Sequence, residues 1–164
     1  VTRMTEALAD LDAAFSTFEV LEPDETERQL AAELEFNAQQ ASLALDPGEA
    51  QLTAMLITRD LRHLLTGDKR AIAALGATDF PPTLDRDVLL GRVICLEQAV
   101  LTLCDVQGAP SVRAAVCAER EVDAQLRICF SCSSPEVGEA SWRDGLRSAI
   151  EEVRGQSADL LHPF

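Results

Sequence analysis

Two short acidic segments, residues 45–51 and 64–71, contain the side chains best suited to chemistry. The first reads LDPGEAQ and contains Glu49, and the second reads LLTGDKRA and contains Asp68. Carboxylate oxygens are the ligands that hard cations such as Mg²⁺ and Mn²⁺ accept, usually one or two of them together with water and substrate phosphate. A cation held in this way activates water and offsets charge on a leaving phosphate oxygen. The two segments therefore indicate metal-assisted hydrolysis of a phosphodiester.

A helix start at Asp46 and a buried strand at residues 61–66 predict how these acids are positioned. Asp46 stands at the N-cap of the helix, a proline follows it, and Glu49 stands at N3. The apolar run 61–66 ends shortly before Asp68, and a second helix is expected over residues 69–75. Alternating helices and strands imply a parallel sheet, whose ligand sites gather at the carboxyl ends of its strands. We therefore expect the two acids at that edge of the sheet.

The chain before Asp46 is expected to complete this α/β unit. Residues 5–15 have the apolar spacing of a short amphipathic helix, and residues 18–21, with sequence FEVL, indicate a short strand. A capping-box pattern at Asp24 opens a helix that is predicted to run to about residue 43. We expect a small, mainly parallel sheet that contains residues 18–21 and 63–66 and is flanked by helices.

The helix start GEA, which contains Glu49, followed by a strand that ends in TGD, which contains Asp68, resembles the PIN-domain family of metal-dependent nucleases. The resemblance extends over about residues 18–75. It implies a PIN-like α/β fold and hydrolysis of RNA phosphodiesters with Mg²⁺ or Mn²⁺, with Glu49 and Asp68 as catalytic and metal-binding acids. It also implies a third metal ligand on the preceding helix, for which Glu33 is the first candidate and Glu27 the second.

The start of the chain departs from the family pattern. PIN domains open with a hydrophobic strand that ends in a metal-binding aspartate, and residues 1–15 contain no such strand. Asp10 and Asp12 lie in a helical pattern, so neither is assigned this role. We expect a PIN-like region over residues 1–80 that lacks its first strand. We also expect little or no nuclease activity from the 164 residues by themselves. The alternative is a non-catalytic module with a PIN-like fold that binds a protein partner or forms a homo-oligomer.

The residues of the expected site also have purely structural interpretations. Glu49 could accept a hydrogen bond from the backbone of Asp46 in a capping box, and Asp68 could serve only as the N-cap of the next helix. Lys69 and Arg70 could bind the phosphates of RNA locally, or they could form a solvated helix end that is balanced by nearby acids. The sequence leaves these alternatives open.

The second half of the chain, residues 81–164, is expected to be an all-helical extension packed on the first half. Apolar periodicity predicts helices over residues 85–106, 110–130 and 139–153. Glu97 lies within the most apolar of these patterns. It is either a buried acid with a raised pKa or, as is commoner, an acid that is paired or at the rim.

The composition limits the other classes of function. The 164 residues include 28 acidic and 14 basic ones, and this net charge of −14 opposes binding of nucleic acid by the whole surface. No apolar run is long enough for a membrane span, and the N-terminus does not resemble a signal peptide, so we expect a cytoplasmic protein. Five cysteines among mostly apolar neighbours are expected to be reduced thiols. The single C-x-x-C at residues 129–132 lacks further ligands nearby, which argues against a zinc or redox site.

Overall fold

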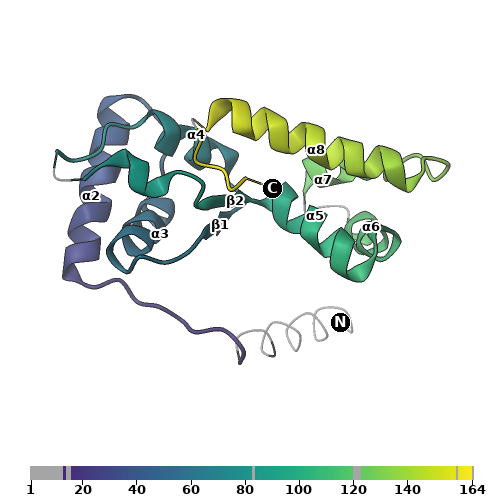
Figure 1. The fold of residues 1–164 in the computed structure, drawn as a ribbon, viewed down its shortest axis with the longest axis horizontal. Helices are drawn as coiled ribbons and strands as arrows, with labels where there is room; N and C mark the ends of the chain where they lie inside the picture. Colours follow the sequence, from purple (N-terminus) through teal and green to yellow (C-terminus); the bar gives the residue numbers. More distant parts are fainter. Residues whose placement is uncertain (1–12, 14–15, 83, 120–122, 158, 164) are drawn as a thin grey trace.

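The computed structural model describes residues 13, 16–82, 84–119, 123–157 and 159–163. Figure 1 shows helices arranged around a small parallel sheet, so the expected mixture of helices and parallel strands is confirmed. The helices are α2 (Glu25–Gln40), α3 (Pro47–Thr58), α4 (Lys69–Ala77), α5 (Leu96–Gln107), α6 (Ala109–Ala118), α7 (Ala124–Cys129) and α8 (Glu139–Gln156), and a 3₁₀ turn, η1, spans Arg86–Leu89. The strands are β1 (Leu64–Thr66) and β2 (Val93–Cys95). Among the described helices, none has the length and apolar character that crossing a membrane requires.

The strands β1 and β2 pair in parallel, and β2 also contacts the C-terminal tail. Leu64 lies opposite Val93, and Thr66 lies opposite Cys95. On the other side of β2, Val93 forms a parallel bridge with Leu161. Because the strands are parallel and in register, their carboxyl ends lie at the same edge of the sheet. The helices that follow them, α4 and α5, therefore begin side by side.

Helices α2, α3 and α4 begin where their capping residues predict. The Asp24 carboxylate accepts a hydrogen bond from the Glu27 backbone N–H at 2.9 Å, and the Glu27 carboxylate accepts one from the Asp24 backbone N–H at 2.8 Å. This capping box opens α2, which packs against α3 and buries Leu34 completely. The predicted starts of α3 at Pro47 and of α4 at Lys69 are also confirmed.

The strand expected at residues 18–21 is wrong. Phe18 and Val20 are 68% and 69% exposed, and the segment joins neither strand of the described sheet. Aromatic and β-branched residues favour a strand only where neighbouring strands and a core can cover them. The helix expected over residues 5–15 lies outside the described part of the chain, apart from the helical residue 13.

The prediction of a single helix over residues 85–106 is also wrong, and so is the prediction of an all-helical second half. Three elements, η1, β2 and α5, occupy this range. Gly91, between η1 and β2, has a φ of 67°, a left-handed conformation that glycine adopts readily and that ends a helix. A short apolar run fits a buried strand as well as a helix, and pairing with β1 makes this one a strand. The helix expected over residues 110–130 is two helices, α6 and α7, whereas the last predicted helix is confirmed as α8.

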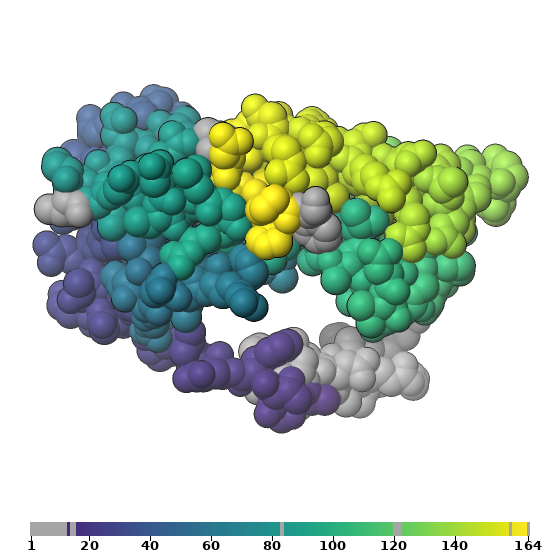
Figure 2. Space-filling view, viewed as in Figure 1, coloured from purple at the N-terminus to yellow at the C-terminus, as the bar shows by residue number. Residues whose placement is uncertain are grey.

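The two halves of the chain share one hydrophobic core. The buried apolar residues form a single cluster that extends from Ala31 in α2 to Leu161 in the tail. Gly76, expected just after its helix, lies inside α4, where an added Cβ would be 3.1 Å from the carbonyl carbon of Ser157. The glycine thus allows α4 to approach the end of α8 closely. In Figure 2 the yellow C-terminal residues lie directly against teal residues from the middle of the chain.

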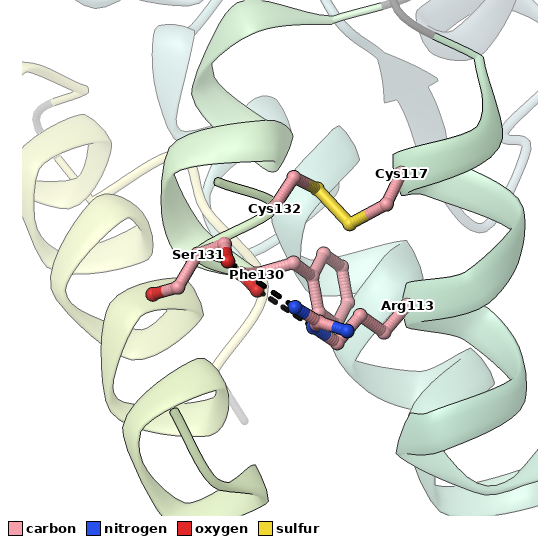
Figure 3. Close-up of a disulfide and its surroundings, with 5 residues drawn as sticks. All are labelled: Arg113, Cys117, Phe130, Ser131 and Cys132. Carbon is pink, nitrogen blue, oxygen red and sulfur yellow. Dashed lines mark hydrogen bonds between the residues drawn. A yellow bond between two sulfur atoms is a disulfide. The ribbon is translucent and has the colours of Figure 1, made fainter. Parts of the chain in front are cut away.

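A disulfide joins α6 to the turn after α7 (Figure 3). Cys117 and Cys132 form this bond, which corrects the expectation that every cysteine is reduced. Beside it, the Arg113 guanidinium donates hydrogen bonds to the backbone carbonyls of Phe130 at 3.0 Å and Ser131 at 3.2 Å. The two cysteines belong to different elements, and spacing along a sequence cannot pair residues in that way. The described free cysteines, all buried, are Cys95, Cys104 and Cys129.

Candidate functional site

Asp68 lies at the junction of β1 and α4, where the sequence predicts it. Its backbone N–H donates to the hydroxyl of the buried Thr66 at 3.1 Å. Its Oδ1 atom accepts hydrogen bonds from the backbone N–H groups of Arg70 at 2.9 Å and Ala71 at 3.3 Å. Asp68 therefore caps α4, which confirms the interpretation of this residue as a helix N-cap. The cap uses Oδ1 and leaves Oδ2 to other partners.

The guanidinium of Arg70 is the partner of this second oxygen. Its Nη2 atom lies 3.1 Å from Asp68 Oδ2. This hydrogen bond is the main reason that the pKa of Asp68 is lowered, and the backbone N–H groups of Ala71 and Arg70 lower it further. The side chain of Arg70 is 75% exposed and that of Asp68 is 24% exposed. Asp68 is thus an ionised acid whose cationic partner is open to solvent.

Asp46 and Glu49 lie at the N-terminus of α3, and no helix cap engages either carboxylate. Asp46 occupies the N-cap position, but its side chain accepts no capping hydrogen bond, and no capping box forms with Glu49. The structural interpretation of Glu49 as a capping-box residue is therefore wrong. Pro47 at N1 fixes a helical φ, so the helix can start there without a side-chain cap.

The charges of Asp46 and Glu49 also act on Arg70. The pKa of the Arg70 guanidinium is raised first by its hydrogen bond and charge contact with Asp68, and then by the charges of Asp46 and Glu49. Arg70 thus contacts Asp68 and also responds to the charges at the N-terminus of α3, and we name Asp46, Glu49, Asp68 and Arg70 the acid–arginine cluster. The sequence predicted that Glu49 and Asp68 share a metal site, and this stays a prediction. It missed Asp46 because an aspartate before Pro47 is typical of a cap.

Lys69 pairs with Glu97 of α5, across the two strand–helix junctions. The side chain of Glu97 is 1% exposed and that of Lys69 is 34% exposed. Apart from the ammonium of Lys69, no described N–H or O–H group donates a hydrogen bond to the Glu97 oxygens, so Lys69 is the counter-charge of Glu97. Glu97 is therefore a buried and paired acid. The ammonium of Lys69, expected to contact phosphate, is already engaged.

Two buried thiols lie near the pair of Lys69 and Glu97. Burial raises the pKa of Cys95 and of Cys129, and the charge of Glu97 raises both further. A raised pKa keeps a thiol protonated and therefore unreactive at neutral pH. These thiols fit a packing role.

The two candidates for a third metal ligand on α2 occupy different surroundings. Glu33 is exposed and lines a shallow surface depression beside Phe36 and the loop at Pro81, a set that includes neither Glu49 nor Asp68. Glu27 is 1% exposed, and Arg59 binds both of its oxygens, with Nε to Oε1 at 2.6 Å and Nη2 to Oε2 at 2.7 Å. This contact is the main reason that the pKa of Glu27 falls to about 2. Glu27 is thus committed to holding α2 against α3.

The acid–arginine cluster has donor chemistry that suits Mg²⁺ or Mn²⁺. These ions are commonly held by one or two protein carboxylates, with water and phosphate as the other ligands. The carboxylates of Asp46 and Glu49, which no cap engages, and Oδ2 of Asp68 meet that need. In the part of the chain that the structure describes, however, no three or more His, Cys, Asp or Glu side chains are already placed to hold a metal ion. The donor types suit the ion, but their arrangement in the described residues does not form a ready metal site.

No family model matches this chain, and no curated protein or solved structure matches it either. The resemblance of its GEA and TGD segments to PIN domains stays a prediction. Its function must be inferred from the residues of the site.

Proposed function

We propose that this protein is a PIN-like, metal-dependent hydrolase of RNA phosphodiesters and that the acid–arginine cluster is its site. The observation that supports the proposal is the exposed guanidinium of Arg70, which contacts Asp68 at the N-terminus of α4 and whose pKa is also raised by the charges of Asp46 and Glu49 of α3. Neighbouring carboxylates repel one another unless a cation lies among them. A divalent cation would offset this repulsion better than one guanidinium does.

Glu49 and Asp68 are the proposed ligands of the cation, and Asp46 adds negative charge beside them. When bound, Mg²⁺ or Mn²⁺ would lower the pKa of a bound water and offset charge on phosphate oxygens. The two backbone N–H groups that hold Oδ1 of Asp68 keep its carboxylate in place before any ligand arrives. Such preorganisation matters because a displacement of about 1 Å at a reacting centre can cost roughly 10²-fold in rate.

Contact with RNA would be local. The net charge of −14 repels a polyphosphate over most of the surface. Arg70 supplies a solvent-exposed guanidinium beside the carboxylates, and the N-terminus of α4 itself favours an anion. A phosphodiester bound at the cluster therefore meets positive charge where hydrolysis needs it.

Cleavage of a single-stranded RNA that carries a fluorophore and a quencher tests this function. We expect slow cleavage in Mn²⁺ or Mg²⁺, none in EDTA, and loss of cleavage in Glu49→Gln. The matched control is Glu152→Gln, which neutralises an exposed glutamate on α8. Cleavage that survives EDTA and Glu49→Gln would contradict the proposal. Absence of both cleavage and cation binding would favour the non-catalytic interaction module.

A further inference from the structure

The disulfide between Cys117 and Cys132 lies at the surface, whereas the free cysteines are buried. Both cysteines of the bond are partly exposed. Cys132 also lines a surface depression of about 400 Å³, and Cys117 is not among the described residues that line it. A molecule that enters this depression therefore reaches the disulfide from the Cys132 side.

The depression beside Cys132 is lined by polar groups that suit a small acidic molecule. Its other lining residues are Ala124, Arg127, Ile128, Ser131, Ser133 and Ser134. A guanidinium binds carboxylates well, and serine hydroxyl groups donate further hydrogen bonds to them. The volume lies within the range of small-molecule sites. The lining therefore suits a small thiol that also carries carboxylate groups.

We propose that the Cys117–Cys132 disulfide is a thiol–disulfide exchange site for a small acidic thiol. The thiolate of this molecule attacks Sγ of Cys132, the disulfide breaks, and Cys117 leaves as a thiolate that takes a proton from water. A second molecule of the thiol attacks the mixed disulfide and departs joined to the first. Two small thiols are thus oxidised to a disulfide, and the protein disulfide is reduced to two thiols. The site is separate from the acid–arginine cluster.

Arg113 favours Cys117 as the leaving group. It lies one helical turn before Cys117 on α6, and Figure 3 shows both side chains directed toward the turn that carries Cys132. A positive charge near a cysteine stabilises its thiolate. Attack at Cys132 therefore develops negative charge on the helix face that already carries a guanidinium.

The turn that carries Cys132 is also held by contacts other than the disulfide. The backbone N–H of Cys132 donates to the carbonyl of Arg127 at 3.1 Å. The Arg113 guanidinium donates to the carbonyls of Phe130 and the next residue at 3.0 and 3.2 Å, and Phe130 is completely buried. These contacts keep Cys132 close to Cys117 after reduction. The bond can therefore form again, and the exchange is reversible.

Cys129, the other cysteine of the C-x-x-C segment, takes no part in this exchange. It is 4% exposed, and burial raises the pKa of its thiol. Its thiol stays protonated and does not compete for Cys132. The sequence argued against a redox site at residues 129–132 because the segment offers only its own pair of cysteines. The structure pairs Cys132 instead with a cysteine 15 residues earlier in the chain.

Reduced glutathione, an acidic tripeptide thiol, is the probe for the first test. The folded wild type is incubated with it without oxygen, quenched with acid, alkylated and mapped by peptide mass spectrometry. We expect reduction without denaturant and a mixed disulfide on Cys132 in roughly tenfold excess over Cys117. A bond that reacts only in urea would be a structural staple and would overturn the proposal. Glutathione attached chiefly to Cys117 would overturn it as well.

A comparison of two thiols tests the acidic character of the ligand. Arg127→Gln should slow exchange with glutathione roughly threefold and leave exchange with the neutral 2-mercaptoethanol unchanged. The control Arg147→Gln removes an exposed arginine of α8 and should alter neither rate. Circular dichroism confirms that each variant is folded. Equal rates of glutathione exchange in the wild type and Arg127→Gln, or equal slowing with both thiols, would contradict a site for an acidic thiol.

Discussion

The two strand–helix junctions of the sheet use charge in opposite ways. β1 leads into α4 and β2 leads into α5, and each junction has an acid at or near the helix start, Asp68 in one and Glu97 in the other. Asp68 is partly exposed and pairs with the exposed Arg70. Glu97 is buried and pairs with Lys69, which comes from the other junction. The first ion pair is open to solvent, and the acid of the second is buried.

This difference shows that the register of the sheet decides the role of an acid as much as its own motif does. Thr66 lies opposite Cys95, so the first turns of α4 and α5 are neighbours and Lys69 can reach Glu97. Arg70, one residue further on, stays at the surface and serves Asp68. The two consecutive basic residues therefore have different roles: Lys69 pairs with a buried acid, and the exposed Arg70 belongs to the candidate site.

The largest effect should follow the loss of Lys69. Lys69→Met leaves the Glu97 carboxylate buried without a counter-charge, and we expect a loss of about 3–5 kcal/mol in the free energy of unfolding. Glu97→Gln should cost less, because the partly exposed ammonium of Lys69 can turn to water. Urea unfolding followed by circular dichroism measures both changes.

The double variant Lys69→Met with Glu97→Leu is the control for this prediction. It removes both charges and replaces them with apolar groups, which in buried ion pairs often restores most of the lost stability. If Lys69→Met cost no more than Glu97→Gln, the buried acid would not depend on Lys69 and the contrast between the junctions would fail.

Glu27 extends the comparison to a buried acid with a complete set of hydrogen bonds. Its pKa falls from 4.5 to about 2, chiefly through the hydrogen bond with Arg59. Because the folded pKa is the lower one, the stabilisation is present above pH 4.5 and is lost as the pH falls toward about 2. The melting temperatures of the wild type and Glu27→Gln should therefore differ most near neutral pH and converge in acid. A difference that stays constant down to the lowest pH would contradict this role.

A smaller effect should distinguish the two aspartates that precede helices. Asp68→Ala removes two capping hydrogen bonds and should cost about 1 kcal/mol. Asp46→Ala removes none, and it should cost less than about 0.5 kcal/mol. Thermal or urea unfolding of the two variants gives the comparison. Equal losses of stability in the two variants would show that the Asp46 side chain caps α3 and is therefore not available to the candidate site.

The elements that position Glu49 and Asp68 were predictable because their signals are local. A proline after an aspartate starts α3, and an apolar run that ends in TGD gives β1 and then α4. The position of Asp68 beyond the carboxyl end of β1 follows from the same local order of strand, turn and helix. These parts of the fold depend on residues close together in the sequence.

The parts that were not predictable depend on partners far along the chain. β2 is a strand because β1 lies beside it, and its apolar run alone fits a helix equally well. The pair of Lys69 and Glu97 depends on that same register. The FEVL segment has the composition of a strand but no partner in the described sheet, so residues 18–21 stay irregular.

The most direct test of the central claim is the titration of Mn²⁺ followed by the electron paramagnetic resonance of the free ion. Asp68→Asn keeps a good helix cap and loses the charge, and Glu49→Gln loses the charge of the other proposed ligand. Asp123→Asn, at the N-cap of α7, is the matched control. We predict that the wild type and Asp123→Asn bind Mn²⁺ equally, and that Asp68→Asn and Glu49→Gln bind it at least roughly tenfold more weakly. Equal binding by all four proteins, or binding by none, would contradict a metal site at the acid–arginine cluster and leave Asp68 as a helix cap.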